Sequence, residues 1–296
     1  MEKEKENSEQ TKGKGSAKMN LKRFLTGIIG FPIVLAVMVL GNKYLIDIIV
    51  AIVSCFAIYE YSKCAKKKNI NIVSWMGYLA SLIIAVLHVF PKELILVIIA
   101  ILFPALIFLL FLHVIISEMK ITFKDIVYTL FGIAYIVGFL MFFALVYGTE
   151  MFAWNLTGKI AIWYVFFSAW GTDTVAYLVG KRLGKHKFSK ISPNKTIEGC
   201  VGGTIGAVIG GILFTMAINL YAGTMIPILP ISIILAILSI VGQFGDFSAS
   251  VVKRSFEVKD FSELFPGHGG MIDRIDSVMF IAPFAYVIFT IISLIV

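Results

Sequence analysis

Nine long apolar blocks constrain this chain more than any other feature. They cover residues 24–41, 44–60, 72–90, 93–112, 126–147, 160–180, 203–222, 226–245 and 278–296. A helix needs about 20 apolar residues to cross roughly 30 Å of hydrocarbon, and most of the blocks approach that length. The short alternating segments of a transmembrane β-barrel do not occur in the sequence. The blocks therefore predict an all-α, polytopic integral membrane protein with about nine transmembrane helices.

The charged residues, which make up only 15% of the chain, are unevenly distributed between the blocks. With the N-terminus in the cytoplasm, the inner connections hold 23 of the 26 Lys and Arg residues, and the outer ones hold Lys43, Lys92 and Lys159. Cytoplasmic loops of membrane proteins carry such an excess. The sequence thus predicts a multi-pass protein of the cell inner (cytoplasmic) membrane with a cytoplasmic N-terminus. Nucleic-acid binding is not expected, because no basic stripe with interleaved aromatic residues occurs.

The blocks divide the chain into three parts. Residues 1–23 are polar and basic, and we expect them to be a disordered tail. We expect residues 24–147 to form helices one to five, and residues 160–296 to form helices six to nine with two cytoplasmic catalytic loops, 181–202 and 246–277. The three cysteines are far apart and form no CxxC motif, so neither a disulfide framework nor a zinc site is expected.

The first of two polar stretches, residues 168–203, reads SAWGTDTVAYLVGKRLGKHKFSKISPNKTIEGCVGG. Asp173 lies inside block 160–180, where a charge that faces lipid costs about 2.5–3.5 kcal/mol. We therefore expect it to face a polar cavity or a cation, or to pair with a lysine or hydroxyl that fixes helix packing. The basic residues between 181 and 190 are typical of an orientation signal. Ser192, Lys195 and Glu198 lie in SPNKTIEG, whose proline and glycine favour a shaped loop.

The second stretch, residues 243–277, reads QFGDFSASVVKRSFEVKDFSELFPGHGGMIDRIDS. Asp246 ends the eighth block, and Lys253 and Arg254 follow two helical turns later. Asp273 and Asp276 are three residues apart, so they share a face of the last predicted helix. Asp276 is expected either to take part in catalysis or to orient that helix.

Three glycines surround His268 just before the last helix. Gly267, Gly269 and Gly270 permit backbone conformations and close approaches that other residues do not. Backbone N–H groups ahead of a helix N-terminus favour binding of a phosphate. His268 is expected either to transfer a proton or to serve as a hydrogen-bond bridge.

The combination of these residue types is more informative than any of them alone. Basic side chains indicate an anion, and carboxylates indicate a cation. Together, beside glycines at helix ends, they are typical of a polyphosphate held through Mg²⁺, which takes one or two protein carboxylates and phosphate oxygens. Phosphoryl and nucleotidyl transfer depend mainly on positioning and charge neutralisation, which such a site supplies.

These motifs closely resemble those of the phosphatidate cytidylyltransferase (CDP-diacylglycerol synthase) family. The resemblance covers roughly residues 168–277, and a match of this length is far more specific than a lone glycine motif. Its elements in this sequence are Ser250, Lys253-Arg254, Lys259-Asp260, Pro266-Gly267-His268-Gly269-Gly270 and Asp273-Arg274-Ile275-Asp276, with Asp173-Thr174-x-Ala176-Tyr177 and Ser192-Pro193-x-Lys195-Thr196-x-Glu198-Gly199 upstream.

The resemblance implies a Mg²⁺-dependent enzyme that makes CDP-diacylglycerol and pyrophosphate from CTP and phosphatidic acid at a lipid bilayer. It also implies a monovalent cation such as K⁺ near the same centre, and a homodimer. The metal ligands it implies are Asp246 and Asp273. The catalytic residues would be Asp246, Asp273, Lys253, Arg254, Arg274, Asp276 and His268. The substrate-binding residues would be Asp173, Ser192, Lys195, Glu198, Lys259, Gly267, Gly269 and Gly270.

One position departs from the family pattern, and several other functions were weighed. Many family members have a glutamate where this chain has Ala249, so any role of that carboxylate is absent here or supplied elsewhere. A CTP-dependent lipid-alcohol kinase would use similar charges but transfer the γ-phosphate. A CDP-alcohol phosphatidyltransferase is disfavoured because its signature does not occur. A transporter would explain Asp173 and many spans, but not the clustering of polar residues in two stretches.

Overall fold

The structure, a computed structural model, describes residues 30, 32–189, 191–193, 195–265 and 269–296. The basic tail predicted at residues 1–23 lies outside these residues. Within them the chain is helical throughout, with two isolated β-bridges, Lys187 with Thr196 and Phe265 with Gly269, and no sheet. The predicted all-α class is thus confirmed for the part of the chain that the structure describes.

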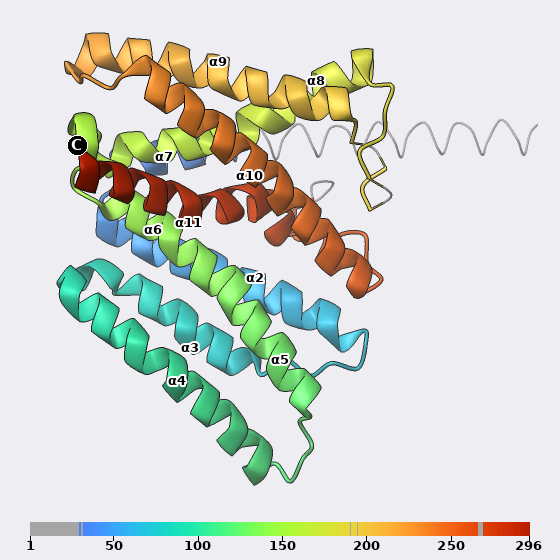
Figure 1. Ribbon diagram of the computed structural model, residues 1–296. Coiled ribbons are helices and arrows are strands. Elements are labelled where there is room, and N and C mark those ends of the chain that lie inside the picture. Colours follow the sequence, from blue (N-terminus) through green and yellow to red (C-terminus); the bar gives the residue numbers. More distant parts are fainter. Residues whose placement is uncertain (1–29, 31, 190, 194, 266–268) are drawn as a thin grey trace, which may run out of the picture.

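The helices follow one another with short connections (Figure 1). Residues 32–40 are helical. They are followed by α2 (Lys43–Lys66), α3 (Ser74–Ala85), η1 (Leu87–Val89), α4 (Lys92–Ile116), α5 (Phe123–Gly132), α6 (Phe139–Gly148), η3 (Ala153–Asn155), α7 (Gly158–Phe166), α8 (Thr172–Leu183), α9 (Ile197–Ala222), α10 (Ile228–Ser255) and α11 (Ile272–Ile295). The π-helical turns η2 (Ile133–Gly138) and η4 (Phe167–Gly171) join α5 to α6 and α7 to α8.

Six of the described helices are long and apolar enough to cross a membrane. These are Lys43–Lys66, Val97–Ile116, Phe123–Gly148, Ile197–Ala222, Ile228–Ser255 and Ile272–Ile295. The predicted block 72–90 is covered by a shorter apolar helix, Ser74–Val89. The predicted block 160–180 is covered by α7, η4 and α8, whose sequence includes Asp173, Lys181 and Arg182. The structure therefore supports a multi-helix membrane protein, while the number of spans stays a prediction.

The loops separate into two sets at opposite ends of the molecule. Figure 1 shows the connections after α2, α4, α8 and α10 at one end, together with both motif stretches. The connections after α3, α6 and α9 lie at the other end, beside the C-terminus. This is the alternation that the predicted topology requires, because all four loops of the first set carry the clustered basic residues.

Both predicted catalytic loops are shorter than the sequence analysis proposed. Helix α8 continues to Leu183 and α9 begins at Ile197, which leaves residues 184–196 as the first loop. Helix α10 continues to Ser255 and α11 begins at Ile272, which leaves residues 256–271 as the second. The helix extends beyond its apolar block, and Ala249, Ser250 and Val252 of this extension are buried. Asp246 and Lys253 therefore project from a helix rather than from a loop.

Glycines on α9 allow α8 to pack unusually close to it. A Cβ at Gly199 would lie 2.9 Å from the Ala176 carbonyl oxygen, and one at Gly203 would lie 2.7 Å from the Thr172 carbonyl oxygen. Small residues four apart favour such close helix approach in membranes. The glycine stripe thereby brings Asp173 on α8 close to the first turns of α9.

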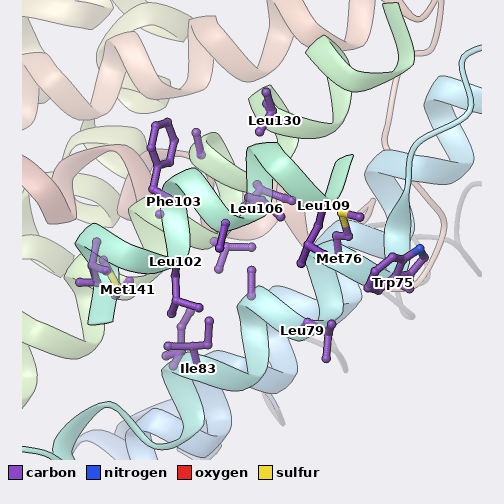
Figure 2. A pocket seen from close by; sticks show the side chains of 18 residues that line it. Trp75, Met76, Leu79, Ile83, Leu102, Phe103, Leu106, Leu109, Leu130 and Met141 are labelled. Carbon is purple, nitrogen blue, oxygen red and sulfur yellow. The ribbon is translucent and has the colours of Figure 1, made fainter. Parts of the chain in front are cut away.

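The first half of the chain packs around α2 and encloses an apolar cavity. The cavity has a volume of about 270 Å³, and Met76 and Ile83 of α3 and Leu106 of α4 are among its lining residues, shown in Figure 2. Its described lining consists of apolar, aromatic and glycine residues and includes no charged side chain. This part of the molecule therefore offers a scaffold rather than a site for ionic chemistry.

Candidate active site

A polar cavity of about 480 Å³ unites the two motif stretches. It lies between α8, the start of α9, α10 and the loop 184–196. Its lining includes four of the predicted site residues, Asp173, Ser192, Lys195 and Asp246. Tyr177, Lys181 and Gln243 complete the polar part of the wall. Residues up to 73 positions apart in the sequence, from 173 to 246, thus face one space.

Lys195 links the first loop to α10. Its Nζ forms an ion pair with Asp246 Oδ2 and lies 4.7 Å from the centroid of the Phe247 ring. Phe188 from the same loop stacks on Phe247 with ring centroids 4.7 Å apart. The loop 184–196 is therefore held against α10 by the charge contact of Lys195 and the aromatic contact of Phe188.

A chain of polar groups leads from Gln243 in the cavity wall into the contact between α8, α9 and α10. The Thr172 and Ser239 hydroxyls are 2.6 Å apart, and Ser239 donates to Thr204 Oγ1 at 3.1 Å. Gln243 Nε2 donates to Thr204 Oγ1 at 3.0 Å and to the Cys200 carbonyl at 3.3 Å. These bonds connect α8, α9 and α10 below the charged residues. The sequence analysis missed them, because single hydroxyls in apolar helices give no pattern.

Glu198 fastens the loop rather than lining the cavity. Its carboxylate accepts from the backbone N–H of Lys185 at 3.1 Å and contacts His186 Nδ1 at 2.6 Å. Thr196 caps α9 by accepting from the Gly199 N–H at 3.1 Å. Glu198 thereby pairs with His186 of the same loop. The structure places Glu198 among loop contacts, and its predicted part in substrate binding stays a prediction.

Asp273 is the most heavily bonded carboxylate of the second motif. Its Oδ1 accepts from Lys253 Nζ at 2.7 Å, and both side chains are largely buried, at 12% and 5% exposure for Lys253 and Asp273. Its Oδ2 accepts from the backbone N–H groups of Phe261 at 3.0 Å and Gly270 at 2.9 Å. Asp273 therefore ties α10, the second loop and α11 together.

Three aspartates and the basic residues around them share one electrostatic field. The charge of Asp246 acts on both Asp276 and Asp173. Lys195 and Arg274 act on Asp173, and Lys253 acts on Asp276. Asp276 itself is buried, and its Oδ1 accepts from the Ser277 N–H at 2.7 Å. Asp276 also packs against α10, since a Cβ at Gly245 would lie 2.9 Å from the Asp276 carbonyl oxygen.

The remaining predicted residues lie at the rim or outside the described chain. Arg254 is exposed and donates to the Val258 carbonyl at 3.2 Å, and Lys259 is exposed. Gly267 and His268 lie outside the described residues. Gly269 has a φ of +80°, a backbone conformation that residues other than glycine rarely adopt. This confirms that the position needs the conformational freedom of glycine.

The sequence analysis missed one buried carboxylate that contacts the second motif, Glu60 on α2. It is 1% exposed and accepts from the backbone N–H of Met271 at 2.8 Å and of Ile272 at 3.0 Å. The Ser262 hydroxyl also donates to it. A signal existed, since Glu60 is a charged residue at the end of the second apolar block, but its partners 202 to 212 residues away could not be read from the sequence.

The donors around the cavity fit a magnesium ion that is shared with substrate. Asp246 and Asp173 both line the cavity. Within the described residues no group of three or more His, Cys, Asp or Glu side chains converges as a metal cage. Mg²⁺ is commonly bound by one or two carboxylates, with phosphate oxygens and water completing its octahedron. Asp273 fits less directly, because both of its oxygens already accept hydrogen bonds.

Comparison with known proteins decides the family. The sequence profile of the Cytidylyltransferase family matches residues 21–292 of this chain. The chain belongs to the cytidylyltransferase family. This match covers the first eight predicted blocks, most of the ninth and the two motif stretches, so the likeness extends well beyond the region in which the motifs alone revealed it.

Curated relatives within the family carry a more specific description. A phosphatidate cytidylyltransferase of Staphylococcus haemolyticus (strain JCSC1435) is 34% identical over 273 residues, covering 88% of this chain and 95% of that protein. One of Bacillus subtilis (strain 168) is 31% identical over 276 residues, covering 92% and 98%. One of Staphylococcus epidermidis (strain ATCC 12228 / FDA PCI 1200) is 34% identical over 263 residues, covering 88% and 95%. This family member therefore aligns with its relatives over nearly their full length.

Proposed function

We propose that this chain is a phosphatidate cytidylyltransferase, which transfers CMP from CTP to phosphatidate in phospholipid biosynthesis. The observation that carries the proposal is the polar cavity in which Asp173, Lys195 and Asp246 from both motif stretches meet. Family membership supplies the reaction type, and the full-length relatives supply the lipid substrate. The products are CDP-diacylglycerol and pyrophosphate.

The reaction needs no nucleophilic side chain. A phosphatidate oxygen attacks the α-phosphorus of CTP, a new P–O bond forms, and the bond between the α-phosphorus and its bridging oxygen to the β-phosphate breaks. Pyrophosphate leaves with the electron pair of that bond. The protein contributes position and neutralising charge as the attacking and leaving oxygens align.

The basic residues of the site have separate places in this scheme. Lys195 and Lys181 line the cavity, and we assign them to the nucleotide phosphates. Lys253 and Arg274 flank Asp273 and the aspartate cluster, where they would neutralise the lipid phosphate. Arg254 and Lys259 are exposed and would meet the substrates first. His268, Gly267 and Glu198 stay in the proposal as sequence predictions.

We also propose that Mg²⁺ binds at Asp246, with Asp173 across the same cavity. When bound, the ion would neutralise phosphate charge. Asp273 would join these ligands only by giving up the 2.7 Å contact with Lys253, which would free Lys253 for a phosphate. A monovalent cation such as K⁺ beside Asp276 belongs to the same proposal.

An apolar groove beside the cavity supports the choice of a lipid acceptor. It has a volume of about 430 Å³, lies between α9 and α10, and shares Cys200 and Gln243 with the polar cavity. Val201 and Phe244 on its walls are exposed, as expected of residues that face acyl chains. A lipid could place its phosphate in the cavity and a tail in the groove.

The proposed reaction also bears on where the active site lies relative to the membrane. We propose that the end carrying loops 184–196 and 256–271 faces the cytoplasm, where CTP is found, and that the chain crosses the inner membrane about nine times. We further propose a homodimer, as the family resemblance implies.

The activity is tested with phosphatidate, Mg²⁺ and CTP that carries its label at either the α- or the γ-phosphate. We expect label in the lipid extract from α-labelled CTP alone, and only with phosphatidate present. Label from γ-labelled CTP with diacylglycerol as acceptor would instead identify a lipid kinase.

The variant Asp246→Asn should lose activity by roughly a hundredfold or more, because it removes charge from a proposed ligand. Full activity of this variant would contradict the metal assignment.

A further inference from the structure

Glu60 is a buried charge in the half of the chain that has no catalytic motif. It lies on α2 and is 1% exposed, within an apolar region where an unpaired carboxylate would be strongly destabilising. Its two oxygens are satisfied by the backbone N–H groups of Met271 and Ile272 and by the Ser262 hydroxyl. All three donors belong to the segment that carries the second motif.

These contacts satisfy the N-terminus of α11 from outside the helix. The first N–H groups of any helix lack partners within it. Here Gly270 N–H donates to Asp273, while the Met271 and Ile272 N–H groups donate to Glu60. Three successive donors are thus divided between a predicted site residue and a residue 213 positions before it in the sequence.

Asp273 and Glu60 also share the hydrogen-bond donors of two successive residues earlier in the loop, Phe261 and Ser262. Phe261 N–H donates to Asp273 Oδ2, and the next residue, Ser262, donates to Glu60. One turn beyond Glu60 on α2, the buried Cys64 thiol donates to the Phe261 carbonyl at 3.1 Å. The loop is therefore held by α2 and Asp273 together at two places, residues 261–262 and residues 270–272.

Gly270 shows how closely the carboxylate approaches the motif backbone. A Cβ at this position would lie 2.6 Å from Glu60 Oε2. The last glycine of the GHGG motif therefore leaves space for Glu60, in addition to any part it has in phosphate binding.

We propose that Glu60 is a positioning residue of the active site, which acts by holding residues 261–262 and 270–272 so that Asp273 and Lys253 keep their geometry. This inference rests on the proposed function, because that function places Lys253, the partner of Asp273, at the lipid phosphate. Glu60 touches no substrate in this scheme. Partners of this kind typically contribute 10–100-fold to affinity or activity.

The test compares two carboxylates on the same helix. Asp47 is also fully buried on α2, but it bonds to His88 at 2.8 Å, away from the motif. We expect Glu60→Gln to lower kcat by about 10–100-fold with little change in KM for either substrate, because positioning acts in the transition state. Asp47→Asn should lower the melting temperature comparably and leave kcat near the wild-type value. Equal kcat losses in the two variants, or wild-type kcat in Glu60→Gln, would overturn the proposal.

A second experiment measures the accessibility of Cys64 and does not depend on catalysis. In a Cys55→Ser, Cys200→Ser background, Cys64 is the remaining thiol and should react slowly with a maleimide because it is 1% exposed. Glu60→Ala should accelerate its labelling at least tenfold, and Asp47→Asn should not. Unchanged protection of Cys64 in Glu60→Ala would refute the anchoring. Faster labelling in a protein whose wild type transfers no CMP would instead refute the proposed function alone.

A compensating pair covers the case of a misfolded single variant. Gly270→Ala should lose activity because its Cβ meets the Glu60 carboxylate. Adding Glu60→Asp withdraws the carboxylate by one methylene, so the double variant should exceed Gly270→Ala in kcat by several-fold. A double variant that is worse than Gly270→Ala would contradict the close contact.

Discussion

At the scale of single residues, the second motif is a set of backbone contacts as much as a set of charges. Asp273 accepts from two backbone N–H groups as well as from Lys253, and Gly269 sits at a φ of +80° directly beside it. A Cβ at Gly269 would lie 2.9 Å from Asp273 Oδ2. The glycines whose spacing favoured phosphate binding therefore also leave room for the Asp273 carboxylate.

Gly269→Ala should accordingly separate backbone strain from site geometry. Strain at a positive φ costs on the order of 1 kcal/mol in stability, and the clash with Asp273 should in addition lower kcat by roughly 100-fold. Gly223→Ala is the matched control, since Gly223 has a φ of +63° with nothing within 4 Å of the added Cβ. Thermal unfolding should shift similarly in both variants, whereas activity should fall only in the first. Comparable activity losses would show that strain alone is responsible.

At the scale of elements, the pairing of α8 with α9 decides where the first motif lies. The sequence placed Asp173 inside a helix but could not say which neighbour it would face. The glycines at 199 and 203 allow α8 to approach α9 closely. Asp173 and Lys195, the latter just before α9, consequently line one cavity.

Gly203→Ala should disturb this pairing. Its Cβ would lie 2.7 Å from the Thr172 carbonyl oxygen, so overpacking should cost about 1–3 kcal/mol of stability. Gly210→Ala on the same helix should be nearly neutral, because its Cβ would meet Phe167 Cδ1 at an ordinary 3.4 Å. Thermal unfolding in one detergent would measure both. Equal melting temperatures for the two variants would argue against close packing of α8 on α9.

The element boundaries also show what an apolar block does not reveal. Block 226–245 ends where polar residues begin, yet α10 continues through Asp246 and Lys253 to Ser255. An apolar block marks the part of a helix that suits a membrane. The end of the helix itself depends on backbone hydrogen bonding and on buried residues such as Ala249 and Val252. The predicted loops were too long for this reason.

At the scale of the whole molecule, the loops divide into two ends, and the charged site lies at one of them (Figure 1). A cysteine introduced at Lys185, in the first loop, should react with a membrane-impermeant maleimide only when the cytoplasmic face is accessible, as in inverted vesicles. A cysteine at Glu150, which is exposed at the other end, should react only in intact spheroplasts. Both need a background without the three native cysteines. The reverse pattern would invert the proposed orientation.

The sequence by itself determined the helical membrane fold, the two motif stretches and the family. These follow from composition, block length and local spacing, all of which are properties of neighbouring residues. The tertiary structure alone decided which groups meet: Lys195 with Asp246, Lys253 with Asp273, the hydroxyl chain from Thr172 to Gln243, and Glu60 with the start of α11. The physical reason is that a buried polar group must find a partner wherever packing supplies one, and packing between distant helices leaves no periodic trace in the sequence.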